Sequence, residues 1–516
     1  MESADFVMRF GSGTHSIQNP VTGEIRMATK HHHNESPAYS ALRASAKILI
    51  DEYVTSNPKS AEAFTAAKAS GIAGGTNRGS IFHTPFPLTF IDAKRATAVT
   101  ADGQQVTDFL GNYTAGLFGF SPEPVKAAVI KAMDNGHALG GASNLLETEV
   151  ASEFIARFPS MDLVRFCSTG TEANSYAIHT ARAVTGRSKI LMYDGAYHGA
   201  WIHGGKAAGP LDTPYEKITV PYGNAELIAD AVAANADEIA AVILEPVSIS
   251  PLVYLKQVSP APYLQKIRQA CDNAGCALIF DEVMTSRLAP GGAQELLGVA
   301  PDLTTFGKYF GGGLPFGGFG GKRAWMERHD PKHPKTINSG GTQHQNAICL
   351  AAVKAVFEHL WSREQCLRHN ERANEFQTAI NELARAYNAP CRAYGTGSLL
   401  NLIWQQRPVI DEQNAADTLT HKFNIVAKRC VSQCAELFWF YMLQRHDILA
   451  GSPKLNYLTL PTTLSDSDYE KFLHGMEKFF QTYADDLQLL LTETKDSDHL
   501  TPEEQETIAL RTTPYP

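Results

Sequence analysis

The sequence lacks several features that would place it in a specialised class of protein. No run of about eighteen apolar residues occurs in its 516 residues, so no membrane-spanning helix is expected. The first residues, MESADFVMRF, include acids and lack the apolar core of a secretion signal. A basic excess is also missing, because the formal net charge is -9. This charge argues against binding to nucleic acid or to an anionic membrane surface.

No CxxC pair occurs among the eight cysteines, which are scattered along the chain. In a chain of this length they indicate reduced thiols within the core and not a disulfide framework. The run His31-His32-His33 is typical of a poorly ordered terminus, and we expect no metal site there. With 44% hydrophobic and 19% charged residues, the chain can bury a large core. We therefore expect a cytoplasmic enzyme of more than one domain.

Short β-type runs alternate with helical runs from about Ser121 onward. This alternation predicts an α/β fold in which a mostly parallel sheet is covered by helices on both faces. In such sheets ligands bind beyond the carboxyl ends of the strands, so the residues that follow each strand are the candidates for chemistry. The expected strands are residues 163–167, 189–193, 240–244, 277–280 and 303–306.

Among the charged residues at these strand ends, one aspartate and one lysine stand out. Strand 277–280 runs into Asp281, and strand 303–306 is followed by Gly307-Lys308. An unpaired buried carboxylate is costly, so Asp281 needs a partner, either a protonated pyridine nitrogen or an arginine or lysine. A Schiff-base role would explain a lysine at a buried strand end, and a surface position is the ordinary alternative.

Three other segments could contact a phosphorylated ring. The turn STGTEAN, residues 168–174, opens a helix whose free N–H groups suit a phosphate, although Thr169 or Thr171 could simply cap that helix. Tyr197 could stack on a planar ligand or could be a packed loop aromatic. The segment SGGT, residues 339–342, could offer a hydroxyl and backbone donors or could be an ordinary turn.

The glycine-rich stretch GGGLPFGGFGGK, residues 311–322, does not match a phosphate-binding loop of nucleotide-binding proteins. Lys322 is followed by Arg323 where such a loop needs Ser or Thr, and Phe316 stands where it needs its first glycine. We therefore reject a nucleotide site at this stretch.

Taken together and in this order, the motifs resemble the class-III aminotransferases of fold type I, over about residues 74–480. The motifs are STGTEAN, DGAYHG, ILEPV, FDEVMTSR, TFGKYFGGGLPFGGFGG and SGGT. Within the class, DEVMTSRLAP, LTTFGKYFGGG and TPFPLTF resemble the branch of glutamate-1-semialdehyde aminomutase and bacterial β-amino-acid (β-phenylalanine) aminotransferases. The resemblance implies pyridoxal 5'-phosphate (PLP) as cofactor and a homodimer with shared active sites.

The resemblance also implies a role for each candidate that meets the cofactor. Lys308 would form the internal aldimine and then shuttle protons, and Asp281 would keep the pyridine nitrogen protonated. Val283 and Tyr197 would pack on the two faces of the ring. Gly170 and Thr171 would bind the phosphate, together with Thr342 of the partner subunit. Glu245 matches the family's strand end near the cofactor.

Arg78 aligns with an arginine that grips the substrate carboxylate in the β-amino-acid branch, with a surface salt bridge as the alternative. The activity implied is transfer of an amino group from a carboxylate-bearing amino acid, β-amino acids included, to a 2-oxo acid. The alternatives are an intramolecular aminomutase of the glutamate-1-semialdehyde type, a racemase or decarboxylase, and a catalytically silent binding protein.

Two departures from the family lie near substrate-facing positions. Lys454 stands where β-amino-acid enzymes place an arginine, and GGTQHQNAICL replaces an Asn-rich stretch. They leave the donor, the acceptor and the stereochemistry open. The expected division of the chain is an extension at 1–40, a segment at 41–120 that joins the small domain, a large PLP-binding domain at 121–345, a C-terminal small domain at 346–490 and a polar tail at 491–516.

Overall fold

The computed structural model describes most of the chain. The described residues are 16–18, 25–27, 37–136, 142–203, 213, 215–248, 260–404, 425–453 and 456–493. His31-His32-His33, Lys454 and residues 494–516 lie outside these ranges. Across the described residues, no helix combines the length and the hydropathy needed to cross a membrane.

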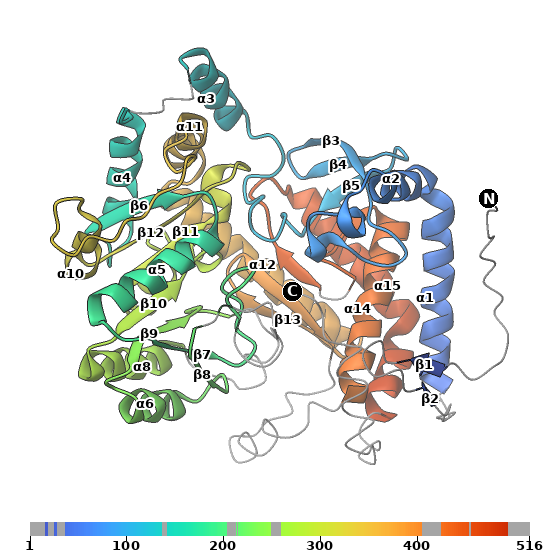
Figure 1. Cartoon of the computed structure of the whole chain (residues 1–516). Helices are drawn as coiled ribbons and strands as arrows, with labels where there is room; N and C mark the ends of the chain where they lie inside the picture. Colours follow the sequence, from blue (N-terminus) through green and yellow to red (C-terminus); the bar gives the residue numbers. More distant parts are fainter. Residues whose placement is uncertain are drawn as a thin grey trace, which may run out of the picture.

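A seven-stranded sheet forms the centre of the larger half of the molecule (Figure 1). Its spatial order is β6-β12-β11-β10-β9-β7-β8, and all strands are parallel except β12, which is antiparallel to both neighbours. The strands are β6 (Leu163–Cys167), β7 (Lys189–Tyr193), β8 (Lys217–Val220), β9 (Ile239–Leu244), β10 (Ala277–Asp281), β11 (Leu303–Gly307) and β12 (Gly317–Gly321). The expected α/β fold is confirmed, and five of the strands match the predicted runs.

Strand β12 was not predicted, because the sequence GGFGG lacks the side chains that mark a strand. Neighbouring atoms explain its glycines. A Cβ at Gly317 would lie 2.4 Å from the carbonyl oxygen of Thr169, and one at Gly318 would lie 2.4 Å from the Phe306 ring. The strand is therefore rich in glycine because its neighbours approach too closely for side chains.

Helices cover both faces of this sheet. On one face α5 (Gly170–Thr185) packs against alternate strand residues such as Ile279 and Leu303. The opposite face is covered by α4 (Leu145–Arg157), α6 (Ala225–Ala234), α8 (Pro260–Ala274) and α11 (Ala347–Ala355), with α3 (Glu123–Asp134) packed on α11. This layering leaves the carboxyl ends of the parallel strands as the edge where a site can form.

The smaller half combines the two ends of the chain. A parallel pairing joins β5 (Gln105–Asp108) to β15 (Ile448–Leu449) in a four-stranded sheet with β4 (Thr97–Thr100) and β3 (Phe90–Lys94). A hairpin at Asp102-Gly103 joins β4 to β5. A three-stranded sheet contains β13 (Cys391–Thr396), β14 (Leu399–Trp404) and β16 (Tyr457–Thr459). The helices of this half are α1 (Pro37–Ser56), α2 (Pro58–Ala69), α12 (Arg363–Ala386), α14 (Ile425–His446) and α15 (Asp466–Glu493).

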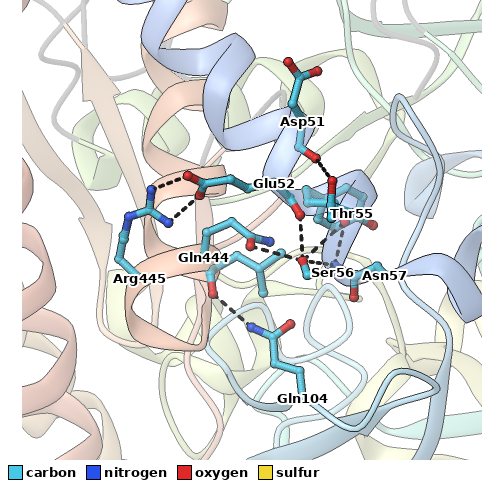
Figure 2. A network of polar contacts seen from close by, with 10 residues as sticks. Asp51, Glu52, Thr55, Ser56, Asn57, Gln104, Gln444 and Arg445 are labelled. Atoms are coloured by element: carbon cyan, nitrogen blue, oxygen red, sulfur yellow. Dashed lines mark hydrogen bonds and ion pairs between the residues drawn. The ribbon is translucent and has the colours of Figure 1, made fainter.

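One apolar core includes residues from both ends, among them Tyr53, Phe109, Trp439 and Phe472. On this basis we propose that residues 41–120 join a small domain with the C-terminal helices α12, α14 and α15. Helix α11, at the start of the expected segment 346–490, packs on the larger sheet instead. Polar contacts also connect the N-terminal helix α1 to the C-terminal helix α14, as Figure 2 shows. Arg445 donates to both carboxylate oxygens of Glu52, and the Ser56 hydroxyl donates to the Gln444 side chain over 3.3 Å.

Residues 37–69 form two helices and not one continuous helix. The break falls at Asn57-Pro58, where α1 ends and Pro58 becomes the first residue of α2. Proline has no backbone N–H and clashes with the preceding turn, so it fits the first position of a helix and interrupts a continuous one. Asp102 accepts hydrogen bonds from the Lys59 and Ser60 amides, which satisfies the new helix start.

Candidate active site

Lys308 and Asp281 lie at the carboxyl ends of adjacent parallel strands. Asp281 is the last residue of β10 and faces Thr305 of β11, and Lys308 directly follows β11. Asp281 is buried, with 6% of its surface exposed, and Lys308 is partly buried. Each charge alters the pKa of the other. The two residues singled out from the sequence therefore share one site.

The Lys308 amine loses its proton more readily than an ordinary lysine does. Burial lowers its pKa to about 8, although the carboxylates of Asp281 and Glu245 act in the opposite direction. Within the described part of the chain, the amine forms neither a hydrogen bond nor an ion pair. The backbone of Lys308 has a positive φ of 51°, which is uncommon for a residue with a side chain. Near neutral pH a larger fraction of this amine is therefore unprotonated and nucleophilic than in an ordinary lysine.

Asp281 is kept as a carboxylate by three donors. His198 Nδ1 donates to Oδ2 over 2.9 Å, Asn174 Nδ2 donates to the same oxygen over 2.8 Å, and the Val283 amide donates to Oδ1 over 3.1 Å. Burial alone would raise the pKa of Asp281, but the hydrogen bond and charge of His198, the Val283 amide and the charge of Lys308 lower it below its usual value. An anionic acceptor within a buried site is the result.

Asn174 orients this network, and sequence reasoning did not assign it a role. Its side-chain oxygen accepts from the Thr305 hydroxyl over 2.6 Å, and its amide also donates to the His198 carbonyl over 2.8 Å. One side chain thus connects α5, β11 and the loop after β7. The sequence offered one indication of this role. Asn174 ends the motif STGTEAN and lies one turn into the helix that the motif opens, on the side that faces the sheet.

The start of α5 forms a candidate anion cradle. Thr169 is the N-cap and its hydroxyl accepts from the Glu172 amide over 3.1 Å, so capping by Thr169 is observed. The amides of Gly170 and Thr171, in the first turn, have no acceptor within the helix. A Cβ at Gly170 would lie 2.8 Å from Val283, so the glycine permits close contact between the cradle and the loop after Asp281. Gly170, Thr171 and Val283 are therefore adjacent.

Glu245 and Tyr197 face the same charged pair. Burial raises the pKa of Glu245 to about 7; Asp281 acts in the same direction, and His198 and Lys308 act against it. The Tyr197 side chain is 48% exposed, its ring lies 5.1 Å from the His203 ring, and its pKa is raised by burial and by Asp281 but lowered by Arg78. An exposed aromatic ring beside the charged pair is suited to stacking on a planar ligand.

Arg78 is exposed, and its charge acts on both Lys308 and Tyr197. Its Nε donates to the Ser80 hydroxyl over 3.0 Å, its Nη1 donates to the Asn112 side chain, and its guanidinium lies 5.2 Å from the centre of the Tyr113 ring. No carboxylate among the described residues pairs with it. The salt-bridge alternative for Arg78 therefore finds no support in the described residues.

Thr342 does not join the other predicted residues in the same chain. It is exposed in the segment 339–342, and no contact with Lys308, Asp281 or Gly170 is found among the described residues. That segment is held beside α5 by Arg165, which donates to the Ser339 carbonyl over 3.2 Å, and by Tyr176, which donates to the Gly340 carbonyl over 3.3 Å. The expected role of Thr342, in the site of a neighbouring subunit, stays a prediction.

Comparison with known proteins gives concordant results. A family model described as Aminotransferase class-III matches residues 82–420. The β-phenylalanine transaminase of Variovorax paradoxus is 33% identical over 436 residues, which cover 84% of this chain and 96% of that protein. The glutamate-1-semialdehyde 2,1-aminomutase of Opitutus terrae is 35% identical over 356 residues, or 65% of this chain and 81% of that protein. A crystal structure of a β-phenylalanine aminotransferase from Variovorax paradoxus superposes with a TM-score of 0.77 at 32% identity, covering 86% of this chain and 98% of that one.

Proposed function

The chain belongs to the class-III aminotransferases, a family that uses PLP, and from this premise we propose that it moves an amino group from a carboxylate-bearing amino acid, β-amino acids included, to a 2-oxo acid. The family resemblance of the motifs is thereby confirmed. The observation that carries the proposal is the placement of Lys308 and Asp281 at neighbouring strand ends, where each acts on the charge of the other.

The residues of the site fit PLP. We propose that Lys308 holds it covalently, that Asp281 accepts a hydrogen bond from its ring nitrogen, and that Val283 and Tyr197 pack on its two faces. The phosphate would bind the amides of Gly170 and Thr171 at the start of α5, where the close packing of Gly170 on Val283 leaves no room for a larger side chain. Thr342 of the partner subunit would complete the phosphate site in a homodimer, and Glu245 would lie beside the cofactor.

Bound PLP supplies an aldehyde that condenses with amines and a ring that withdraws electrons from the amine-bearing carbon. Lys308 Nζ, with its pKa lowered to about 8, can accept and return a proton near neutral pH. Asp281 keeps a negative charge in a buried setting, because His198 and Asn174 donate to it. It can therefore hold a proton on a ring nitrogen that would otherwise lose it.

Arg78 is the proposed ligand of the substrate carboxylate. Among the described residues, its contacts with Ser80 and Asn112 use two of the five guanidinium N–H donors, so three remain for an anion. Paired guanidinium donors match the geometry of a carboxylate. The similarity to a protein named β-phenylalanine transaminase supports a β-amino acid as one donor.

A panel of donors tests the proposal. Purified holoenzyme is mixed with α-amino acids, β-amino acids and amines without a carboxylate, and the absorbance of the cofactor is followed. Donors are expected to convert it to the pyridoxamine form, with carboxylate-bearing donors favoured, and an added 2-oxo acid should reverse the change. A cofactor spectrum unchanged by every amine would contradict the proposal.

An aminomutase is the second candidate, and the similarity to glutamate-1-semialdehyde 2,1-aminomutase favours it. A mutase rearranges one molecule and needs no acceptor. Glutamate-1-semialdehyde turned over without a 2-oxo acid would favour this alternative, whereas product formation that requires a 2-oxo acid favours transamination.

A further inference from the structure

Four successive residues, Gly111 to Thr114, have a left-handed backbone. Their φ angles are 54° for Gly111, 49° for Asn112, 52° for Tyr113 and 77° for Thr114. Residues with side chains adopt this region rarely and usually singly, because Cβ approaches the following carbonyl oxygen. A run of this kind persists only where the surrounding structure imposes it, and such strained segments cluster at functional sites.

Two side chains impose the conformation from both ends. At the start, buried Asp108 accepts hydrogen bonds from the amides of Leu110 over 2.7 Å and Gly111 over 3.1 Å. At the end, the Thr459 hydroxyl accepts from the Thr114 amide over 3.1 Å and donates to the Leu110 carbonyl. A Cβ at Gly111 would lie 2.4 Å from the backbone oxygen of Thr459, so this glycine lets β16 approach the turn.

The turn presents its two middle side chains to Arg78. The Asn112 side-chain oxygen accepts from Arg78 Nη1, and the Tyr113 ring lies under the guanidinium at 5.2 Å. The Tyr113 hydroxyl donates over 2.9 Å to the carbonyl of Ser80, whose own hydroxyl accepts from Arg78 Nε. Arg78 is thus restrained on one edge by Asn112, on another by Ser80 and on one face by Tyr113.

We propose that the left-handed turn fixes the Arg78 guanidinium for the substrate carboxylate, and that Asn112 and Tyr113 are positioning residues of the substrate site. The inference rests on the proposed role of Arg78. An exposed arginine has many rotamers, and ordering it before the substrate arrives removes that entropic cost from binding. Because Asn112 accepts through a neutral amide, it orients the guanidinium and leaves its charge free for the carboxylate.

The test is calorimetric binding of 3-phenylpropanoate, a carboxylate without an amine, to the holoenzyme, with 3-phenylpropanamide as the uncharged probe. Asn112→Gly tolerates the left-handed backbone and removes the acceptor. It should weaken binding of the carboxylate about tenfold, the size of one hydrogen bond to a charged group, and should leave amide binding unchanged. Asn112→Asp, which keeps the shape and neutralises Arg78, should weaken carboxylate binding at least as much.

Two further variants separate the possible outcomes. Arg78→Ala should also weaken carboxylate binding, and Asn112→Gly should add nothing in that background. Asn388→Gly is the matched control, because Asn388 is an exposed left-handed asparagine, φ 47°, outside the site, and both probes should bind it as they bind the wild type.

Each contrary result has a separate meaning. If Arg78→Ala weakens carboxylate binding and both Asn112 variants do not, the positioning role is overturned while the proposed function stands. Equal weakening of both probes by Asn112→Gly would indicate a merely structural role and would overturn it as well. If Arg78→Ala has no effect on carboxylate binding, the role of Arg78 and this inference fail together.

Discussion

At the scale of single residues, the site depends on the charge states of a lysine and an aspartate. Burial favours the neutral form of both side chains. Burial lowers the pKa of Lys308 to about 8 and favours its neutral amine. Burial would also neutralise Asp281, but hydrogen bonds from His198 and Asn174 oppose this and keep the carboxylate charged. Lys308 thus loses its proton more easily than an ordinary lysine, and Asp281 stays an anion beside it.

The pH dependence of PLP binding to the apo-protein follows from Lys308. Its amine is protonated below its pKa and neutral above it, so the rate of cofactor attachment should rise with pH and level off above about 8. An unperturbed lysine would give a rate that rises to about pH 10.4. Absorbance of the bound cofactor after mixing at different pH values provides the measurement.

The control for this experiment is Asp281→Asn, which keeps the shape and removes the charge. Since the Asp281 carboxylate raises the pKa of Lys308, its loss should move the midpoint to lower pH. A midpoint near 10, or one that moves upward in the variant, would contradict the electrostatic account of the pair.

The sequence indicated the charged residues of the candidate site better than the polar residues that contact them. A charged residue at the end of an apolar run is visible in the sequence, as with Asp281 and Lys308. Asn174 and Thr305 were not assigned because an amide or hydroxyl is common on helices and strands, and its role depends on contacts between distant segments.

At the scale of elements, β12 explains how a glycine-rich segment can be a strand. Five strands were predicted from their apolar runs, but GGFGG has no such pattern and its partners are set by the tertiary structure. Similarly, the chain is helical on both sides of Pro58, but the helix is interrupted there. Hydrophobic periodicity indicates which side chains are buried, and it gives no information on segments that contribute mainly backbone contacts.

A single methyl group tests the role of β12. Gly317→Ala places a Cβ 2.4 Å from the carbonyl oxygen of Thr169, in the turn that precedes the proposed phosphate cradle. The contact is with backbone, so overpacking should cost about 1–3 kcal/mol of unfolding free energy. The displaced turn should also weaken retention of PLP, and denaturant unfolding and dialysis against cofactor-free buffer would measure the two effects.

Gly79→Ala is the matched control for stability, because no heavy atom lies within 4 Å of the added Cβ and its φ is not in the left-handed region. Its unfolding free energy should match that of the wild type. Equal stability of Gly317→Ala and Gly79→Ala would show that β12 does not need its glycine.

At the scale of the whole molecule, apolar packing should hold the two ends of the chain together more strongly than the polar network of Figure 2 does. The Glu52–Arg445 ion pair is partly exposed, so Arg445→Ala should cost less than about 1 kcal/mol. Trp439 is 2% exposed in the shared core beside Tyr53 and Phe440, and Trp439→Ala should cost about 3–5 kcal/mol.

Denaturant unfolding of the two variants gives the comparison. If Arg445→Ala were the more destabilising change, the contact between the N-terminal and C-terminal segments would be mainly electrostatic, against this account.

The division of the chain into domains could be anticipated only in outline from the sequence. The pairing of β5 with β15 joins residues more than three hundred positions apart, and no local pattern reports such a contact.

The account as a whole requires that Lys308 is the residue that carries the cofactor. Reduction of the holoenzyme with borohydride fixes the cofactor to its lysine, and peptide mapping by mass spectrometry identifies that lysine. The account predicts the phosphopyridoxyl group on the peptide that contains Lys308, and its absence from the Lys308→Ala protein. The group on any other lysine of the wild-type protein would contradict it.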